Sequence, residues 1–202
     1  MRKQLLWSLF LLGGVVSAGN LLPDASFELG GTDYDVRRFA DITDPRQLRN
    51  IPPVADPEQP VHGNVSLRFD NPYRVPLGLR SPDIALRDDT AYTFSFYARS
   101  SKPVKLRALI FSVITRDETR RNGEWDNGNC RFFTLGREWK RYSITFTPKK
   151  GFRWYFMDLL WGEGADATVW IDAMMLSPGK TLLPFAPKSE VEFALDSPRH
   201  CR

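Results

Sequence analysis

The stretch Tyr92-Thr-Phe-Ser-Phe-Tyr-Ala-Arg99 decides the fold class of this chain. Its apolar side chains fall at every second position, so they lie on one face of an extended strand, and most of the polar side chains take the other face. Residues 139–148 repeat this alternation, and residues 105–115, 152–161 and 168–176 are apolar runs of strand length. No segment holds a helical period of 3.6 residues. The pattern predicts an all-β sandwich with few, short helices.

The first 18 residues form a segment of a different kind. Arg2 and Lys3 precede an apolar run, and Val16-Ser17-Ala18 offers the small residues that a signal peptidase needs. A membrane anchor would need about 20 apolar residues, and this run is shorter. We therefore expect a signal peptide at 1–18, a domain at 19–187 and a disordered tail at 188–202, in a protein secreted to the periplasm or the extracellular space without a membrane span.

Charge and cysteine content restrict the function classes. The chain has 28 basic and 24 acidic residues and a formal net charge of +4, of which Arg2 and Lys3 contribute two. The arginines are interleaved with acids and form no basic stripe, so we expect no nucleic-acid partner. Cys130 and Cys201 are the only cysteines. A bridge between them is compatible with export but is not required by the sequence.

Five fragments occur in an order typical of one protein family. They are Asn20–Glu28, His62–Arg68, Tyr92–Arg99, Glu138–Phe146 and Val169–Leu176. With this set, the chain resembles the galactose-binding-like jelly-roll domains, and within them the carbohydrate-binding modules of families 4, 9 and 22. The resemblance covers nearly the whole chain after residue 18. It implies a jelly roll whose first strand, within residues 20–28, lies beside its last strand.

The same resemblance implies a structural calcium ion held by Glu28 and Asp172 together with backbone carbonyls. Calcium takes six to eight oxygen ligands, which two strand ends and a loop can supply. Asp172 lies in an otherwise apolar strand, and a buried carboxylate needs a compensating partner. A metal is one such partner, while backbone amides or an arginine are the alternatives. The family often has a second acid where this chain has Ala173.

A sugar site combines an accessible aromatic ring with planar polar side chains, because sugars present apolar C–H faces and hydroxyl groups. Tyr97 and Arg99 share the polar face of their strand. On residues 152–161 we assign Tyr155 and Trp161 to the exposed face and Trp154 to the core, and we place Trp125 and Asn127 in a polar loop at 116–130. The predicted ligand-binding residues are Tyr97, Arg99, Trp125, Asn127, Tyr155 and Trp161.

The sequence therefore predicts non-catalytic binding of a polysaccharide or oligosaccharide, beside a hydrolase or within a surface assembly. The first alternative is a structural or adhesive domain on the same scaffold. The second is a small glycoside hydrolase, for which Asp117, Glu118, Glu124 and Asp126 are available. These acids cluster in one loop, whereas hydrolysis needs two carboxyl groups at a fixed separation across the bond. We therefore expect the protein not to be an enzyme.

Overall fold

The computed structural model describes residues 19–38, 53–72, 74–113, 123–162 and 166–188, with the backbone alone described at 37, 38, 113 and 123–128. The predicted signal peptide and all but the first residue of the predicted tail lie outside these ranges. The part of the chain that is described contains strands and turns but no helix, and hence no helix of the length and hydropathy that a bilayer crossing needs. The prediction of an all-β sandwich is confirmed.

Five of the strands in the described residues coincide with the alternating and apolar runs of the sequence. The strands are β1 (Asp35–Arg38), β2 (Val54–Asp56), β3 (Ser66–Phe69), β4 (Leu77–Arg80), β5 (Ile84–Ala85), β6 (Tyr92–Ser100), β7 (Val104–Val113), β8 (Gly123–Leu135), β9 (Lys140–Phe146), β10 (Trp154–Trp161) and β11 (Val169–Pro178).

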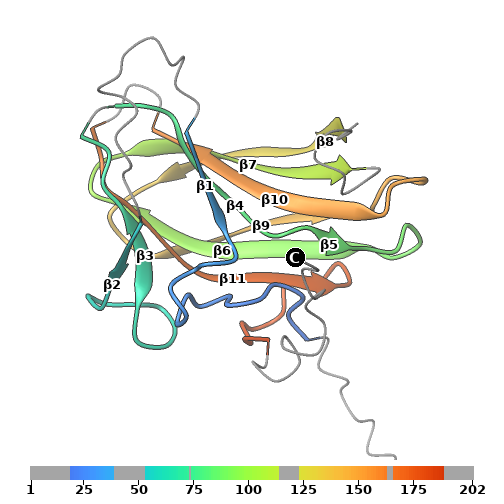
Figure 1. Cartoon of the computed structure of the whole chain (residues 1–202), viewed down its shortest axis with the longest axis horizontal. Helices are drawn as coiled ribbons and strands as arrows, with labels where there is room; N and C mark the ends of the chain where they lie inside the picture. Colours follow the sequence, from blue (N-terminus) through green and yellow to red (C-terminus); the bar gives the residue numbers. More distant parts are fainter. Residues whose placement is uncertain (1–18, 39–52, 73, 114–122, 163–165, 189–202) are drawn as a thin grey trace, which may run out of the picture.

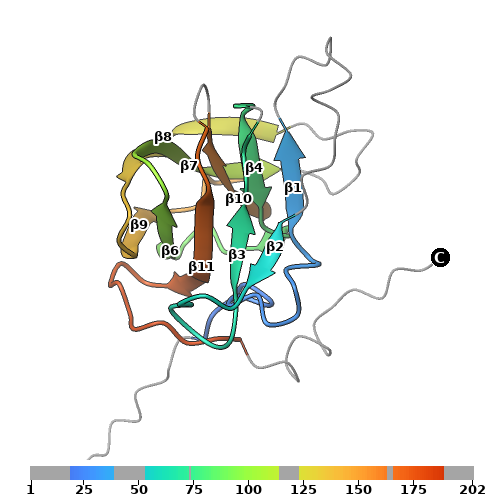
Figure 2. The ribbon, with the colours of Figure 1, turned by 90° about the vertical axis from the view of Figure 1, so that its left-hand side faces the viewer.

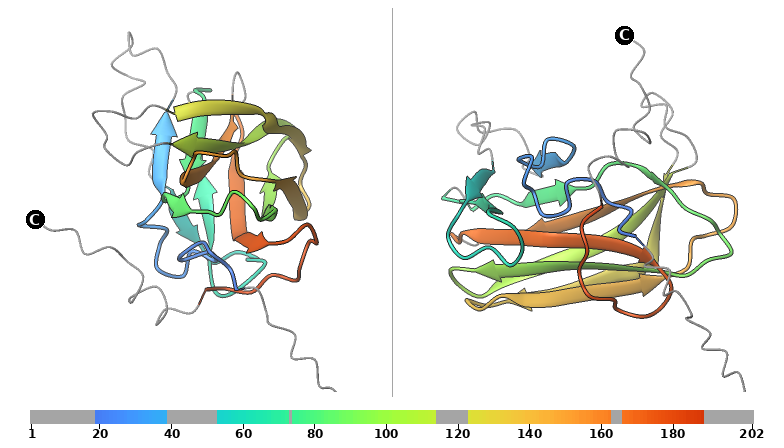
Figure 3. Two further views of the ribbon diagram at one scale, coloured as in Figure 1. Left: turned by 90° about the vertical axis from the view of Figure 1, so that its right-hand side faces the viewer. Right: turned by 90° about the horizontal axis from the view of Figure 1, so that it is seen from below.

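These strands form two antiparallel sheets that pack face to face (Figures 1 and 2). One sheet has the order β1-β4-β10-β7-β8, with β5 also paired to β10, and the other has the order β2-β3-β11-β6-β9. Apart from the pairs β2–β3 and β7–β8, neighbours in both sheets are not consecutive in sequence, as in a jelly roll, so the sequence order of the strands says little about which side chains meet. Figure 3 shows β11, β6 and β9 side by side in the second sheet.

The core lies between the two sheets and consists of the apolar side chains that occur at every second position of the strands. Phe94, Phe96 and Ala98 of β6 are fully buried, as the alternation predicts, and Ile144 and Phe146 of the neighbouring strand β9 lie on the same side of the sheet. Each buried aromatic or branched side chain contributes roughly 1.5–3 kcal/mol through removal of apolar surface from water. The core is therefore the main source of stability.

The N-terminal stretch lies where we expected it, but it is not a strand. Residues 22–34 form turns, because Asp24 accepts hydrogen bonds from the backbone N–H groups of Leu29 and Gly31 at 2.9 and 2.7 Å and so folds the chain back. Two backbone bonds still join the stretch to β11, Leu21 N–H to Leu176 O and Met174 N–H to Ala25 O. The opening and closing segments of the domain therefore lie together, as predicted.

The predicted loop at 116–130 is partly wrong. Residues 114–122 lie outside the described residues, and from Gly123 onward the chain forms β8, where Trp125 pairs with Phe111 of β7. A register shift between Leu109 and Phe111 absorbs the extra residues of β8. Pairing with a long central strand here overrides the turn preference of the glycines and asparagines, which is the usual outcome when tertiary context opposes local propensity.

Candidate functional site

The orientation of β10 decides what the outer face of the first sheet presents. Tyr155 and Trp161 belong to the core, with only 2% and 3% of their surface exposed. Alternation along the strand therefore places Trp154, Phe156 and Asp158 on the outer face. The prediction that Tyr155 and Trp161 line an exposed groove is wrong, and so is the assignment of Trp154 to the core.

The error has a physical cause. β10 lies inside its sheet and is buried from its second residue to its last, so its sequence is apolar on both faces and its alternation cannot be assigned to an inside and an outside. One signal was present. Asp158 lies an even number of residues from Trp154 and Phe156, so the three side chains share one face of the strand. Because Asp158 is charged, that face is expected to be the outer one.

We call the outer face of the first sheet the β10 face. The residues that define it are Arg80, Arg107, Phe111, Trp154, Phe156 and Asp158.

At the centre of the β10 face lies an ion pair on an aromatic base. Arg80 donates from Nε and Nη2 to the two carboxylate oxygens of Asp158, at 3.0 and 2.7 Å. The same guanidinium carbon lies 3.7 Å from the ring centroid of Phe156, and that ring stacks on Phe111 at 4.7 Å and 17°. Arg80 thus binds a carboxylate along its edge and an aromatic ring on its face, which a lysine could not do.

The ion pair is nearly closed off from water. Asp158 is 2% exposed, and burial raises the pKa of its carboxyl, an effect that the bond and the charge of Arg80 partly offset. Buried ion pairs stabilise a fold little better than apolar residues of the same volume. Charged, planar groups set into an aromatic layer are, however, the composition that recognises sugar hydroxyls and C–H faces.

Accessible aromatic groups lie beside this centre. Trp154 is half-buried at the start of β10, and Phe132 of β8, opposite Arg107, is 69% exposed. An aromatic ring so exposed on a strand has no packing role that explains it. The β10 face therefore combines a fixed polar centre with rings that a ligand can reach.

The outer face of the second sheet, which we call the β6 face, contains the predicted residues Tyr97 and Arg99. The residues that define it are Tyr97, Arg99, Trp139, Arg141 and Trp170. Arg99 lies between two indoles, with its guanidinium carbon 4.3 Å from the ring of Trp170 and 5.2 Å from that of Trp139. The indole N–H groups donate to Asp56 Oδ2 and to Gln59 O, both at 2.8 Å. The structure thus brings the two predicted residues together and adds two tryptophans, Trp139 and Trp170, that are not in the predicted set of ligand-binding residues.

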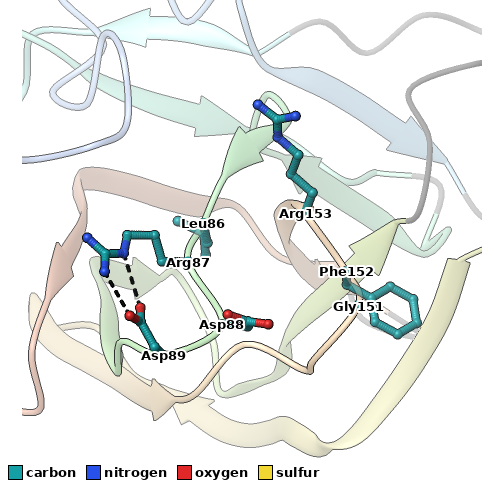
Figure 4. Close-up of a pocket in the computed structure, with 7 residues that line it drawn as sticks. All are labelled: Leu86, Arg87, Asp88, Asp89, Gly151, Phe152 and Arg153. Carbon is teal, nitrogen blue, oxygen red and sulfur yellow. Dashed lines mark hydrogen bonds and ion pairs between the residues drawn. The ribbon is translucent and has the colours of Figure 1, made fainter.

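A third surface is a hollow of about 300 Å³ at one end of the sandwich (Figure 4). Its lining residues are Leu86, Arg87, Asp88, Asp89, Gly151, Phe152 and Arg153. Arg87 and Asp89 bind each other through two hydrogen bonds, at 3.1 and 2.7 Å, while the ring of Phe152 points away from them. Because the polar groups do not converge, this hollow is a weaker candidate than either sheet face.

Part of the domain matches a known family model, and the whole domain has a known fold. Residues 72–156 match the model of a family described as a carbohydrate binding domain, CBM_4_9. The chain carries a jelly roll of the carbohydrate-binding-module type. The predicted resemblance is confirmed, and no curated protein sequence gives a significant match.

Solved structures support the fold of this module. TmCBM61 in complex with β-1,4-galactotriose superposes with a TM-score of 0.56 at 16% identity, over 79% of this chain and 99% of that one. The C-terminal family 22 module of Clostridium thermocellum Xyn10B gives 0.55 at 14% identity, over 83% and 99%. The enzymatically active domain of bacteriophage CBA120 tailspike protein 4 gives 0.60 at 10% identity, over 79% of this chain but only 21% of that one.

The two predicted metal ligands accept hydrogen bonds from backbone amides and, at Glu28, also from the side-chain amide of Asn64. Asp172 is fully buried and accepts hydrogen bonds from the N–H groups of Val61, His62 and Ala173, at 2.6, 3.1 and 2.6 Å. Glu28 accepts three bonds from Asn64 and Val65. These carboxylates fasten the 61–65 segment to the domain.

This donor set does not fit a calcium ion. Calcium needs oxygen ligands, and the groups that surround both carboxylates present N–H hydrogens, which repel a cation. Among the described residues no three acidic, histidine or cysteine side chains gather in a group that could hold a metal. The contacts match the alternative in which Asp172 caps backbone amides, and calcium stays a prediction for experiment.

Several predicted residues cannot be placed. The side chains of Trp125, Asn127, Glu124 and Asp126 lie outside the described residues, as do Asp117, Glu118 and Cys201 entirely. The residues that sequence reasoning missed are Arg80, Phe111, Phe156 and Asp158. Phe111, Phe156 and Asp158 lie in apolar runs of the sequence. The charge of Asp158, which marks the face of its strand, is the only sequence signal for them.

Proposed function

We propose that this module binds carbohydrate on the β10 face without cleaving it. The observation that carries the proposal is the Arg80–Asp158 pair, fixed on the ring of Phe156 and flanked by Trp154 and Phe132. The bidentate ion pair holds Arg80 in one orientation, and this side chain is still 12% exposed, so a sugar hydroxyl meets a preorganised donor. The aromatic side chains supply the stacking surface that a sugar ring needs.

Non-catalytic binding follows from the role of Asp158. Its carboxylate is tied to a guanidinium on both oxygens, so it is a poor general acid or nucleophile. The family match and the similarity to TmCBM61, whose structure holds β-1,4-galactotriose, support sugar binding as the activity. In this proposal residues 1–18 direct export, and the module serves a neighbouring hydrolase or a surface assembly.

The test is calorimetric titration with neutral oligosaccharides that include β-1,4-galactotriose. We expect the Phe132→Ala protein to bind the recognised sugar roughly tenfold or more weakly, because the sugar loses an aromatic stacking surface of the kind that is worth about 1–3 kcal/mol to a nucleic-acid base. Phe132 is 69% exposed, so its replacement leaves the fold intact. Leu182→Ala, at a residue 45% exposed outside both sheets, is the matched control and should bind as the wild type does.

The outcomes separate the candidate functions. A sugar that binds the wild type and the Phe132→Ala protein equally would exclude the β10 face as the site. If no glycan in the panel binds, the proposal fails and the structural or adhesive function gains support. Release of reducing ends during the titration would instead indicate a hydrolase.

A further inference from the structure

The β6 face carries unpaired positive charge. Arg68 of β3 is neutralised, since it lies 3.3 Å from both Asp56 and Asp70. Within the described residues no carboxylate pairs with Arg99 or Arg141. The hydrogen bonds that these two arginines donate to described residues go to neutral acceptors: Arg99 to Glu58 O at 3.4 Å, and Arg141 to Ser95 Oγ at 2.9 Å and to Met175 Sδ at 3.8 Å.

Unused donors accompany this charge. A guanidinium has five N–H donors, and the Nε atoms of both Arg99 and Arg141 are buried without a partner. These two Nε atoms are shielded from solvent, but both arginine side chains are only half-buried, so a ligand would meet their Nη groups, which lack a charged acceptor among the described residues. An anionic acceptor suits both the charge and the donor geometry.

Aromatic rings frame the same donors. Arg68, Trp170 and Arg99 lie opposite one another across β3, β11 and β6, with Trp139 on the far side of Arg99. Tyr97 lies directly opposite Arg141, whose guanidinium carbon is 5.6 Å from its ring. The indoles and the phenol ring are half-buried, so part of each is within reach of a ligand.

We propose that the β6 face is a second glycan site, specific for sugars that carry a carboxylate, such as the uronic acids of acidic polysaccharides. This inference rests on the proposed function but uses the opposite face of the sandwich. A carboxylate accepts two parallel bonds from one guanidinium, and the C–H face of the same ring packs on an indole. The β10 face lacks this capacity because its central arginine already holds Asp158.

The experiment compares polygalacturonate oligosaccharides, neutral galactan oligosaccharides of equal length and dextran sulfate. We expect the wild type to bind the uronate oligomers, and Arg99→Gln to weaken that binding roughly tenfold or more, as the loss of a charge-assisted bond predicts. Arg99→Lys should weaken it by a similar factor, because lysine keeps the charge but loses the bidentate geometry. Arg87→Gln, which removes an exposed arginine away from both faces, is the control.

A second readout uses the wild type and so does not depend on a folded variant. Uronate oligomers should shift the NMR signals of the Trp139 and Trp170 indole N–H groups and leave that of Trp154 unchanged. Shifts at Trp154 alone, equal binding of dextran sulfate, or no binding of uronate would each overturn the inference. Neutral sugar that still binds in a Phe132-dependent way would leave the proposed function standing, and loss of all binding would remove both.

Discussion

Two buried aspartates, one from each sheet, are compensated in different ways. Asp158 of β10 is held by the guanidinium of Arg80, whereas Asp172 of β11 has only backbone N–H groups as partners. Burial raises the pKa of both carboxyls, that of Asp172 to about 6. A charged partner keeps an aspartate ionised and in place, while amide dipoles alone leave it close to protonation. The ion pair of Asp158 suits a recognition site, and the amide bonds of Asp172 suit the attachment of the 61–65 segment to the domain.

The largest effect should come from breaking the ion pair. Asp158→Ala leaves the guanidinium of Arg80 buried without its partner, and we expect the free energy of unfolding to fall by about 3–5 kcal/mol. The same substitution at Asp89 should change little, because the Arg87–Asp89 pair lies in water. Urea denaturation of the two variants measures the difference.

A double substitution sharpens this result. Arg80→Met with Asp158→Leu replaces the pair by apolar groups and should recover most of the lost stability, as in other buried ion pairs. It should also abolish sugar binding on the β10 face while the protein stays folded. An Asp158→Ala protein as stable as the Asp89→Ala protein would show that the pair is not buried in solution.

The sequence predicts the buried side of a strand where apolar and polar residues alternate. It does not predict that side where both faces of the strand are apolar. The alternation of residues 92–99 was enough to predict β6, its core side and the polar side that bears Tyr97 and Arg99. The apolar run that forms β10 does not reveal which face of the strand points into the core, so the sequence assigns Tyr155 and Trp161 to the wrong face. The contact between Arg80 and Asp158 joins residues 78 positions apart, which only the jelly-roll pairing of β4 with β10 determines.

The pH dependence of the free energy of unfolding should reveal the protonation of Asp172. Between pH about 4 and about 6 the folded protein keeps a proton on Asp172 that the unfolded chain has released, because burial outweighs the N–H bonds from His62, Val61 and Ala173. Stability from this group is therefore fully present below pH about 4 and is lost as the pH rises through 6. The two pKa units correspond to about 3 kcal/mol.

Denaturation at several pH values measures this slope, and Asp172→Asn isolates it. The variant should lose most of the decrease between pH 4 and 6, although it will also be less stable because an amide NH₂ faces backbone donors. Asp89→Asn is the control. The pKa of Asp89 is lowered by its bonds to Arg87 and Thr90, so its contribution falls below this pH range. An unchanged slope in the Asp172→Asn protein would assign it to another group, such as Asp158.

The smallest effect decides between amides and calcium as the partner of Asp172. If hydrogen bonds alone hold the 61–65 segment, a chelator leaves the melting temperature unchanged, and Glu28→Gln lowers the free energy of unfolding by about 1 kcal/mol through weaker bonds to Asn64 and Val65. This is the outcome we expect, because N–H groups surround both carboxylates.

A calcium ion would raise the melting temperature and lower the pKa of Asp172, so the slope between pH 4 and 6 would vanish in calcium and return with the chelator. Calorimetric melting with and without EDTA, at pH 5 and pH 7, distinguishes the two, and a calcium-dependent slope would mean that both buried aspartates have a cationic partner.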